Sequence, residues 1–363
     1  MGGKLKTPLP EGSTIGIFGG GQLGRMTAIA AAELGYRTHI FAPQGDAPAC
    51  DVAAASTRAD YLDTDALKAF GQSVDTVTSE FENVPASVMD ILAQHCPVSP
   101  GKAALEVAQH RIREKTLARE LGIKTPRFAA ITSAEQMPAA MADMTNGAIL
   151  KTCRLGYDGK GQARIAAGQD GIGGFESLGS DDCILEEMIN FSAEASFLVA
   201  RNHQGEVAVF PASINTHEDG ILAISEAPAN PAILTPQLKK DGEDAVIALA
   251  EKLDLMGVLA VEMFITPDGL MFNEMAPRPH NSFHWTIEGT KTSQFAQLVR
   301  AITGLPLGST AAMGQWRMDN ILGQHMDRLN AALGEDGVFI HRYGKSEAKH
   351  GRKMAHITTQ IEV

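Results

Sequence analysis

Several features that would place this chain in a membrane or an oxidising compartment are missing from its sequence. No run of about 18 apolar residues occurs, so we expect no membrane-spanning helix. The opening residues, MGGKLKTPLPEGS, lack the apolar core of a secretory signal. The cysteines form no CxxC pair, which predicts free thiols, a reducing cytoplasm and no zinc site. They are Cys50, Cys96, Cys153 and Cys183.

Positive charge is also scarce. The 363 residues include 43 acidic and 31 basic side chains, giving a formal net charge of -12. This balance argues against a broad nucleic-acid-binding face but leaves room for a local anion pocket. With 44% hydrophobic and 20% charged residues, the composition is that of a globular protein of two or three packed units.

The first hundred residues alternate strand and helix patterns, which predicts a doubly wound parallel sheet. The expected order is strand 14–18, helix 22–34, strand 38–42, helix 65–70, strand 74–78, helix 86–95 and strand 97–98. A long helix is predicted over 103–121, and mixed strands and helices follow. We expect an α/β and α+β protein with units at 1–110, 111–305 and 306–363, the middle one divided near residue 190.

Two glycine-rich segments suggest phosphate binding. Residues 151–162, KTCRLGYDGKGQ, follow a short strand and combine glycines, which let backbone N–H groups approach an anion, with cationic side chains. Cys153 fits this loop better as a small residue than as a nucleophile. Residues 19–24, GGGQLG, satisfy the GxGxxG pattern, but no acid closes the second strand as a nicotinamide site requires. A packing turn and a phosphate site at a helix N-terminus stay open.

A predicted hairpin at 261–275 places two acidic side chains opposite each other. A three-residue loop, PDG, pairs Glu262 with Glu274 on one face, where like charges are destabilising unless a cation lies between them. Such oxygen ligands suit Mg²⁺ held together with substrate phosphates; a solvated acidic pair is the alternative. Asn273 adds an oxygen only if its strand bulges.

The loop after this hairpin is unusually polar. Four polar side chains fall within five positions, which predicts an anion or substrate site: Arg278, His280, Asn281 and Ser282. Glu80 follows the strand at 74–78, where ligands of open α/β sheets gather, and is a candidate substrate contact.

Six segments together resemble a known family. The loop lysine, GYDGKG and the E…NE hairpin resemble the ATP-grasp fold. The chain is more closely similar to the N5-carboxyaminoimidazole ribonucleotide synthetases of purine biosynthesis in GGGQLGRM, EFENVP, KTCRLGYDGKGQ, EEMINFSAEAS, NEMAPRPHNSFHW and GRKMAHI, which span residues 19–357. It departs from the family's pattern at Cys153 and Leu155, where other members often carry arginine, threonine or glycine.

The resemblance implies an ATP-grasp fold with an N-terminal doubly wound domain and a small C-terminal subdomain. It also implies a reaction. ATP and bicarbonate would give carboxyphosphate and ADP, and the amine of 5-aminoimidazole ribonucleotide would then attack to form the N5-carbamate. It further implies a homodimer that uses Mg²⁺ without biotin. The cysteines, the short apolar runs and the negative net charge add the expectation of a cytoplasmic protein that binds neither membrane nor nucleic acid.

The resemblance also implies site residues. Glu262 and Glu274 would hold Mg²⁺. Lys151, Lys160 and Arg278 would neutralise charge during phosphoryl transfer, and Asp158 would orient the substrate amine. Expected at ATP are Arg111, Lys151, Gly156, Tyr157, Asp158, Gly159, Lys160, Gly161, Gln162, Glu186, Glu187, Met188, Ile189, Glu194, His217, Asn273 and Glu274. Expected at the ribonucleotide are Gly21, Gln22, Leu23, Glu80, Tyr157, Asp158, Lys160, Arg278, His280, Asn281, Ser282, Lys345, Arg352 and Lys353.

Three other functions remain as alternatives. Another ATP-grasp ligase, such as the formate-dependent purine transformylase, would share the hairpin and the glycine loop. A nicotinamide-dependent oxidoreductase would rest on GGGQLG alone. A non-catalytic module would bind ATP without turnover, although the intact Glu262 and Glu274 pair argues against it.

Overall fold

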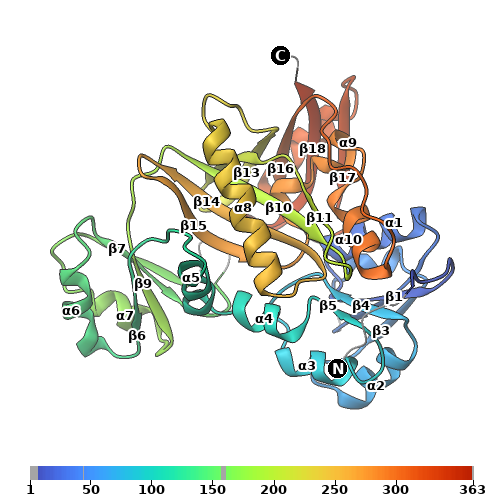
Figure 1. Cartoon of the computed structure of the whole chain (residues 1–363), viewed down its shortest axis with the longest axis horizontal. Helices are drawn as coiled ribbons and strands as arrows, with labels where there is room; N and C mark the ends of the chain where they lie inside the picture. The colour runs from blue at the N-terminus through green and yellow to red at the C-terminus, as the bar shows by residue number, and fades with distance from the viewer. Residues whose placement is uncertain (1–6, 44, 157–160, 362–363) are drawn as a thin grey trace.

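The computed structural model describes residues 7–43, 45–156 and 161–361, and these form three β-sheets (Figure 1). The first sheet is parallel, in the order β3-β2-β1-β4-β5. It confirms the doubly wound prediction, although the short polar strand β3 was not predicted. Its elements are β1 Thr14–Phe18, α1 Gln22–Glu33, β2 Arg37–Ala42, β3 Ala55–Arg58, α2 Thr64–Gln72, β4 Thr76–Ser79, α3 Ala86–Leu92 and β5 Val98–Ser99.

The predicted long helix at 103–121 is wrong, because two helices occupy this segment. They are α4 Lys102–Ala108 and α5 Arg111–Glu120. His110 has an extended backbone, with φ -137° and ψ 108°, which interrupts the helical path. The Gln109 side chain donates to Glu82 O at 2.6 Å and Val84 O at 2.5 Å, so a tertiary contact holds the break. The break sets Arg111 at the start of α5.

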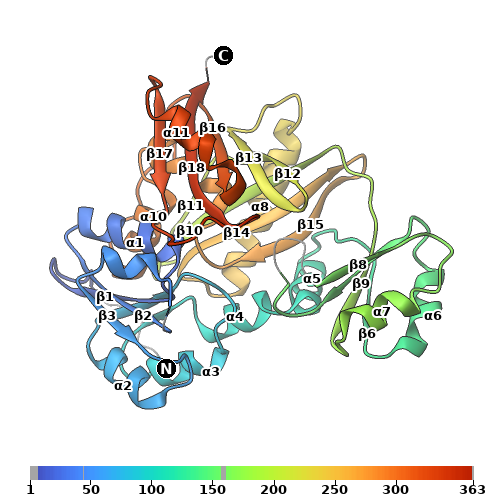
Figure 2. The same ribbon diagram turned by 180° about the vertical axis from the view of Figure 1, so that it is seen from behind.

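The second sheet is small and antiparallel, in the order β6-β9-β7-β8. It stands at one end of the molecule in both Figures 1 and 2. Two short helices pack with it around buried Met137, Leu150 and Leu185. The elements are β6 Phe128–Ile131, α6 Met137–Ala142, β7 Ala148–Thr152, β8 Gln162–Ile165, α7 Ile172–Leu178 and β9 Cys183–Glu187.

The third sheet has nine strands among the described residues, and β13 pairs with β16 to carry it into the C-terminal segment. The predicted boundary at 306 therefore falls between strands of one continuous sheet. Strands are β10 Ala193–Arg201, β11 Val207–Val209, β12 Ser213–Glu218, β13 Ile221–Ala227, β14 Gly257–Thr266, β15 Gly269–Ala276, β16 Gln315–Leu322, β17 Val338–Arg342 and β18 Lys353–Ile361. Helices are α8 Pro236–Lys252, α9 Thr286–Gly289, α10 Gln294–Thr303 and α11 Met326–Ala332.

Gly242 lies where α8 crosses β10, against the fully buried ring of Phe197. A Cβ at this position would overlap that ring. Gly242→Ala should therefore lower the free energy of unfolding by about 1–3 kcal/mol, measured by urea denaturation, because the ring or the helix must shift. Gly173 in α7 is exposed, with no described atom within 4 Å of its Cβ position. Equal destabilisation by Gly173→Ala would contradict the packing explanation.

Candidate active site

Two neighbouring cavities bring most of the predicted residues together. The first, of about 320 Å³, is lined by the turn at residues 21–23 and is called the glycine-turn cavity. The second, of about 290 Å³, is lined by Glu194, Glu262 and Glu274 and is called the carboxylate cavity. Among the described residues, five line both cavities: Arg111, Glu274, His280, Asn281 and Lys353. Two ligands bound in these cavities would therefore be neighbours.

The hairpin β14–β15 supplies the carboxylates through a register that differs from the predicted one. Its turn has two residues, because Thr266 pairs with Gly269 rather than with Leu270. This register alone would place Asn273 opposite Glu262. A β-bulge next to Glu262 adds one residue and restores the predicted pairing of Glu262 with Glu274. The bulge also lets Asn273 line the carboxylate cavity with both glutamates.

The carboxylate cavity concentrates negative charge. Glu262 is buried, and burial together with nearby Glu274 raises its pKa to about 7. His217 Nδ1 lies 3.1 Å from Glu194 Oε2, and one ligand atom each from Glu194, His217 and Glu262 lie within 4.8 Å of one another. Carboxylate oxygens gathered in this way fit a hard divalent cation, since the cation would relieve their mutual repulsion.

Cationic side chains face these carboxylates from α5 and β7. Arg111 Nη1 lies 3.1 Å from Glu274 Oε2, and Arg111 Nη2 donates to Gly156 O at 3.2 Å. Burial acts to raise the pKa of Glu274, but the Arg111 charge outweighs it and holds the pKa below its ordinary value. Lys151 Nζ donates to Glu186 Oε2 at 2.8 Å. Lys151 and Arg111 both line the carboxylate cavity, where they can meet an anionic ligand.

Lys115 lines neither cavity but supports two predicted site residues, Glu186 and Asn273, and the sequence reasoning missed it. It is fully buried and lies four residues after Arg111, on the same side of α5. Its Nζ lies 3.3 Å from Glu186 Oε1 and donates to Asn273 O at 2.7 Å. Burial acts to raise the pKa of Glu186, but Lys115 and Lys151 lower it to about 2. The i, i+4 spacing in RIREK was the signal that could have found this lysine.

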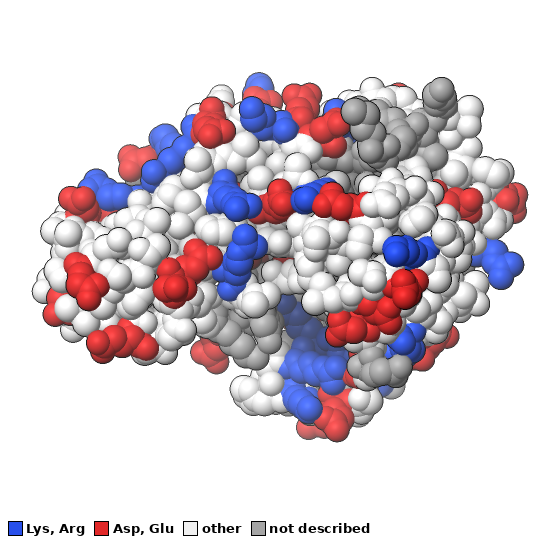
Figure 3. All heavy atoms as spheres, turned by 90° about the horizontal axis from the view of Figure 1, so that it is seen from below, with Lys and Arg blue, Asp and Glu red and all other residues white. Residues whose placement is uncertain are grey.

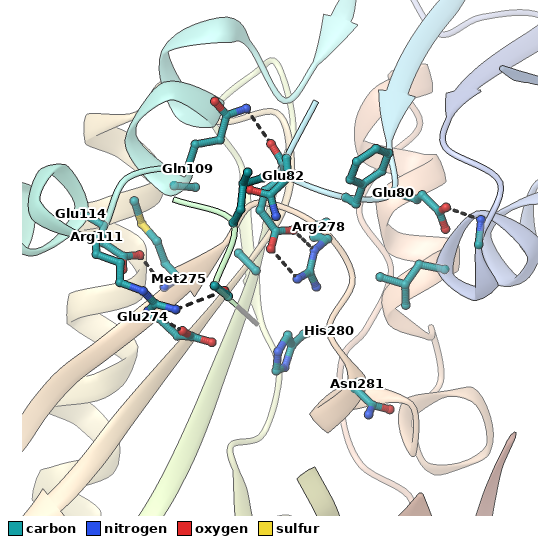
Figure 4. Close-up of a pocket in the computed structure, with 18 of the residues that line it drawn as sticks. Glu80, Glu82, Gln109, Arg111, Glu114, Glu274, Met275, Arg278, His280 and Asn281 are labelled. Carbon is teal, nitrogen blue, oxygen red and sulfur yellow. Dashed lines mark hydrogen bonds and ion pairs between the residues drawn. The ribbon is translucent and has the colours of Figure 1, made fainter. Parts of the chain in front are cut away.

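The glycine turn at the start of α1 is bonded to a carboxylate. Gly21 N and Gly24 N donate to the two carboxylate oxygens of Glu80, the second at 2.6 Å. Figure 4 shows Glu80 with one dashed line from its carboxylate to a backbone nitrogen. A Cβ at Gly21 would lie 2.8 Å from Glu80 Oε1, so any larger residue here would displace the Glu80 carboxylate. The turn therefore has the anion-binding geometry of a helix N-terminus.

The polar side chains of the loop after β15 differ in whether they reach the cavities. Arg278 forms a two-pronged ion pair with Glu82 in the glycine-turn cavity (Figure 4). Ser282 is fully buried and bonds His280 Nδ1 at 2.8 Å, so it lies behind the imidazole. Asn281 lines both cavities, and within the described part of the chain its buried amide oxygen and nitrogen have no hydrogen-bond partner. Its amide is thus positioned to bind a ligand.

The predicted C-terminal cations differ in position, and within the described part of the chain Lys345 and Arg352 line neither cavity. Lys345 Nζ donates to Lys353 O at 2.7 Å, and Lys353 lines both cavities. Arg352 Nη2 lies 2.6 Å from Asp46 Oδ2, and the two side chains form an ion pair. Basic side chains also gather in a hollow of the face shown in Figure 3, where acidic and basic groups are otherwise interspersed. On this face, the hollow is thus a local concentration of positive charge.

Comparisons with known proteins agree with this architecture. Three family models match the chain: the ribonucleotide synthetase preATP-grasp domain at 13–109, the ATP-grasp domain at 116–295 and the phosphoribosylaminoimidazole carboxylase C-terminal domain at 317–361. The N5-carboxyaminoimidazole ribonucleotide synthase of Brucella melitensis biotype 1 is 43% identical over 97% of this chain and 98% of its own. The chain belongs to the N5-carboxyaminoimidazole ribonucleotide synthase family.

Solved structures of this synthase family share the fold. An N5-carboxyaminoimidazole ribonucleotide synthetase in complex with ADP superposes with a TM-score of 0.94 at 38% identity, covering 99% of this chain and 95% of its own. The synthase of Aspergillus clavatus with ADP and 5-aminoimidazole ribonucleotide gives 0.88 at 27% identity, covering 97% and 94%. The predicted family and fold are confirmed. The transformylase and oxidoreductase alternatives are not favoured.

Some residues that the resemblance implies, Glu186 among them, line neither cavity within the described part of the chain. Tyr157, Asp158, Gly159 and Lys160 fall outside the described residues. Glu187, Met188 and Ile189 are not among the described residues that line either cavity. The backbone N–H groups of Glu187 and Met188 donate to Arg127 O and Gly147 O. A base at this segment would have to use other backbone groups.

No helix among the described residues is both long and apolar enough to cross a membrane.

The described residues on either side of positions 157–160 lie near the two cavities. Gly161 O accepts from Thr152 N at 3.0 Å, and Gln162 begins β8 and lines the carboxylate cavity. Gly156 and Leu155 line the glycine-turn cavity. The loop thus approaches both cavities from β7 and β8.

Proposed function

We propose that the protein carboxylates 5-aminoimidazole ribonucleotide with bicarbonate at the expense of ATP, giving the N5-carbamate, ADP and phosphate. One observation carries the proposal: the carboxylate and glycine-turn cavities share Arg111, Glu274, His280, Asn281 and Lys353. A nucleotide in the carboxylate cavity would have its terminal phosphate next to a ribonucleotide in the glycine-turn cavity. The names of the related synthases, and the ADP and ribonucleotide bound in one of them, support this assignment.

The first step would form carboxyphosphate. A bicarbonate oxygen attacks the γ-phosphorus of ATP, and the bond from that phosphorus to ADP breaks. Arg111 and Lys151 would neutralise the phosphates, which is the main requirement of phosphoryl transfer. Glu262 and Glu274 would hold Mg²⁺, which supplies charge neutralisation when bound. The partly exposed Glu274 carboxylate also orients Arg111 through their ion pair.

The second step would transfer the carboxyl group. The amine nitrogen of the ribonucleotide attacks the carboxyl carbon, phosphate leaves, and the amine proton is lost. Arg278 and Asn281 line the glycine-turn cavity and would position the substrate. Holding the amine beside a trapped intermediate makes the step effectively unimolecular. Lys160 and Asp158 remain predicted contributors, to charge neutralisation and to amine orientation.

The ribonucleotide phosphate would bind between the glycine turn and the C-terminal cations. The Gly21 and Gly24 N–H groups, now bonded to Glu80, provide donors of the kind that bind phosphate at a helix N-terminus. Lys345, Arg352 and Lys353 would supply positive charge. The protein would act in the cytoplasm as a homodimer and without biotin.

The first experiment is ADP release with Mg-ATP and bicarbonate, measured with and without 5-aminoimidazole ribonucleotide. We expect strong stimulation by the ribonucleotide, and labelled bicarbonate in an acid-labile product. ADP release that ignores this ribonucleotide but responds to glycinamide ribonucleotide with formate would overturn the substrate assignment. ATP binding without turnover under every combination would favour a binding module.

Ribonucleotide capture should weaken at alkaline pH. Burial, with the neighbouring Arg352 and Lys353 charges, lowers the pKa of Lys345 to about 8. The lysine is cationic below that pH and loses its charge above it, while the substrate phosphate stays ionised. kcat/KM for the ribonucleotide should therefore fall above pH 8 by up to about 10-fold per unit, at saturating ATP and bicarbonate. Lys345→Arg keeps its charge, so an identical alkaline limb in that variant would exclude Lys345.

A further inference from the structure

Three metal-ligating side chains converge at the base of the glycine loop. His110 lies between α4 and α5, Cys153 directly follows β7, and Asp182 directly precedes β9. One ligand atom from each residue lies within 4.8 Å of the others. Cys153 N donates to Asp182 O at 2.8 Å, and Arg111 N donates to Cys153 O at 3.1 Å. Backbone hydrogen bonds thus hold the three segments together.

Access and an unpartnered imidazole nitrogen favour a cation at this cluster, whereas a neighbouring arginine opposes it. Cys153 is buried but lines the glycine-turn cavity, which gives an ion a route from solvent. His110 Nε2 lies 3.4 Å from Asp182 Oδ1, while His110 Nδ1 is buried and, among the described residues, has no hydrogen-bond partner. Arg154 Nε lies 3.9 Å from Asp182 Oδ2 and competes for this carboxylate.

We propose that His110, Cys153 and Asp182 form a binding site for a thiophilic divalent cation of the Zn²⁺ type. Thiolate, imidazole and carboxylate are the usual ligands of such ions, and three protein ligands leave a fourth position for water. On binding, the thiol proton passes to solvent, a metal–sulfur bond forms and metal-bound waters leave. The absence of a CxxC pair concealed this site, because its ligands come from three separate segments.

The site differs in chemistry from the carboxylate cavity, whose donors Glu194, Glu262 and Glu274 are oxygen atoms and suit Mg²⁺. A cation at the new site would cross-link the start of α5, which carries Arg111, to the small sheet, which carries Lys151. It would therefore link two structural units that both supply cations to the carboxylate cavity.

The test is a Co²⁺ titration of the untagged full-length protein in excess Mg²⁺, followed by absorption. A thiolate–Co²⁺ charge-transfer band that saturates at one equivalent per chain, and that Zn²⁺ abolishes, is expected. Cys153→Ser should remove this band. The matched variants Cys183→Ser and Cys50→Ser, which alter a neighbouring buried thiol and a distant one, should retain it.

Two further variants keep the test decisive if Cys153→Ser fails to fold. His110→Asn and Asp182→Asn should each weaken Co²⁺ binding while circular dichroism stays unchanged, because each removes one ligand. No charge-transfer band in the wild-type protein would overturn the proposal. So would a band that survives Cys153→Ser, or one unaffected by both His110→Asn and Asp182→Asn.

Discussion

Replacing Glu274 with glutamine is expected to reduce ATP turnover about 1000-fold, because metal-based charge stabilisation in phosphoryl transfer contributes several kcal/mol. Glu274 lies opposite Glu262 across the bulged hairpin, and its Oε2 also accepts from Arg111 at 3.1 Å. The amide is nearly the same size but carries no charge, so it weakens the metal site and releases Arg111. The kcat for ADP release at saturating substrates measures the loss.

Two controls separate this effect from damage to the fold. Glu251→Gln changes an exposed glutamate on α8 and should leave kcat unchanged. Glu274→Gln should keep the urea denaturation midpoint close to that of the wild type, and high Mg²⁺ should restore part of its activity. Full turnover in Glu274→Gln at ordinary Mg²⁺ would remove Glu274 from the metal site.

Replacing Lys115 with methionine should lower the free energy of unfolding by about 3–5 kcal/mol, which is the usual cost of removing one partner of a buried ion pair. Lys115 is fully buried between Glu186 Oε1 at 3.3 Å and Asn273 O at 2.7 Å. Methionine fills the space but leaves Glu186, among the described residues, with the ion pair to Lys151 alone. Urea denaturation measures the change.

A double variant tests whether charge is the cause. Lys115→Met combined with Glu186→Gln should be more stable than Lys115→Met alone, because the unpaired carboxylate is gone. Lys102→Met removes an exposed ion pair with Asp90 and should leave the denaturation midpoint nearly unchanged. Strictly additive effects of the Lys115 and Glu186 substitutions would show that lost packing, not charge, accounts for the destabilisation.

Local patterns were sufficient to predict the parallel sheet and the carboxylate hairpin. The alternating apolar strands and the turn residues around TPDG carry that information within a few positions. The register of the hairpin was less predictable: the pairing of Glu262 with Glu274 was anticipated, but it arises from a two-residue turn and a bulge instead of a three-residue turn. The shorter turn shifts the register by one residue and the bulge shifts it back, so both arrangements pair the same two glutamates. The sequence pattern does not distinguish between these arrangements.

Features that depend on distant contacts could not be predicted. The break between α4 and α5 is held by Gln109 bonding to Glu82 O and Val84 O, from a loop more than 20 residues away. Glu80 was predicted as a substrate contact and lines the glycine-turn cavity, but its hydrogen bonds from Gly21 N and Gly24 N were not foreseen. Helix propensity and motif spacing describe neither contact. The resemblance identified candidate residues, but the hydrogen-bond partners of these residues depend on the tertiary structure.

The pairing of β13 with β16 has a consequence for how the chain can be divided. Strands β16, β18 and β17 hydrogen-bond in turn beyond β13, so residues after 305 complete a sheet begun by the ATP-grasp segment. A protein ending there would expose β13 as an unpaired edge strand, a template for aggregation. The C-terminal segment therefore belongs to the same sheet as the strands that carry the carboxylates, although a separate family model matches it.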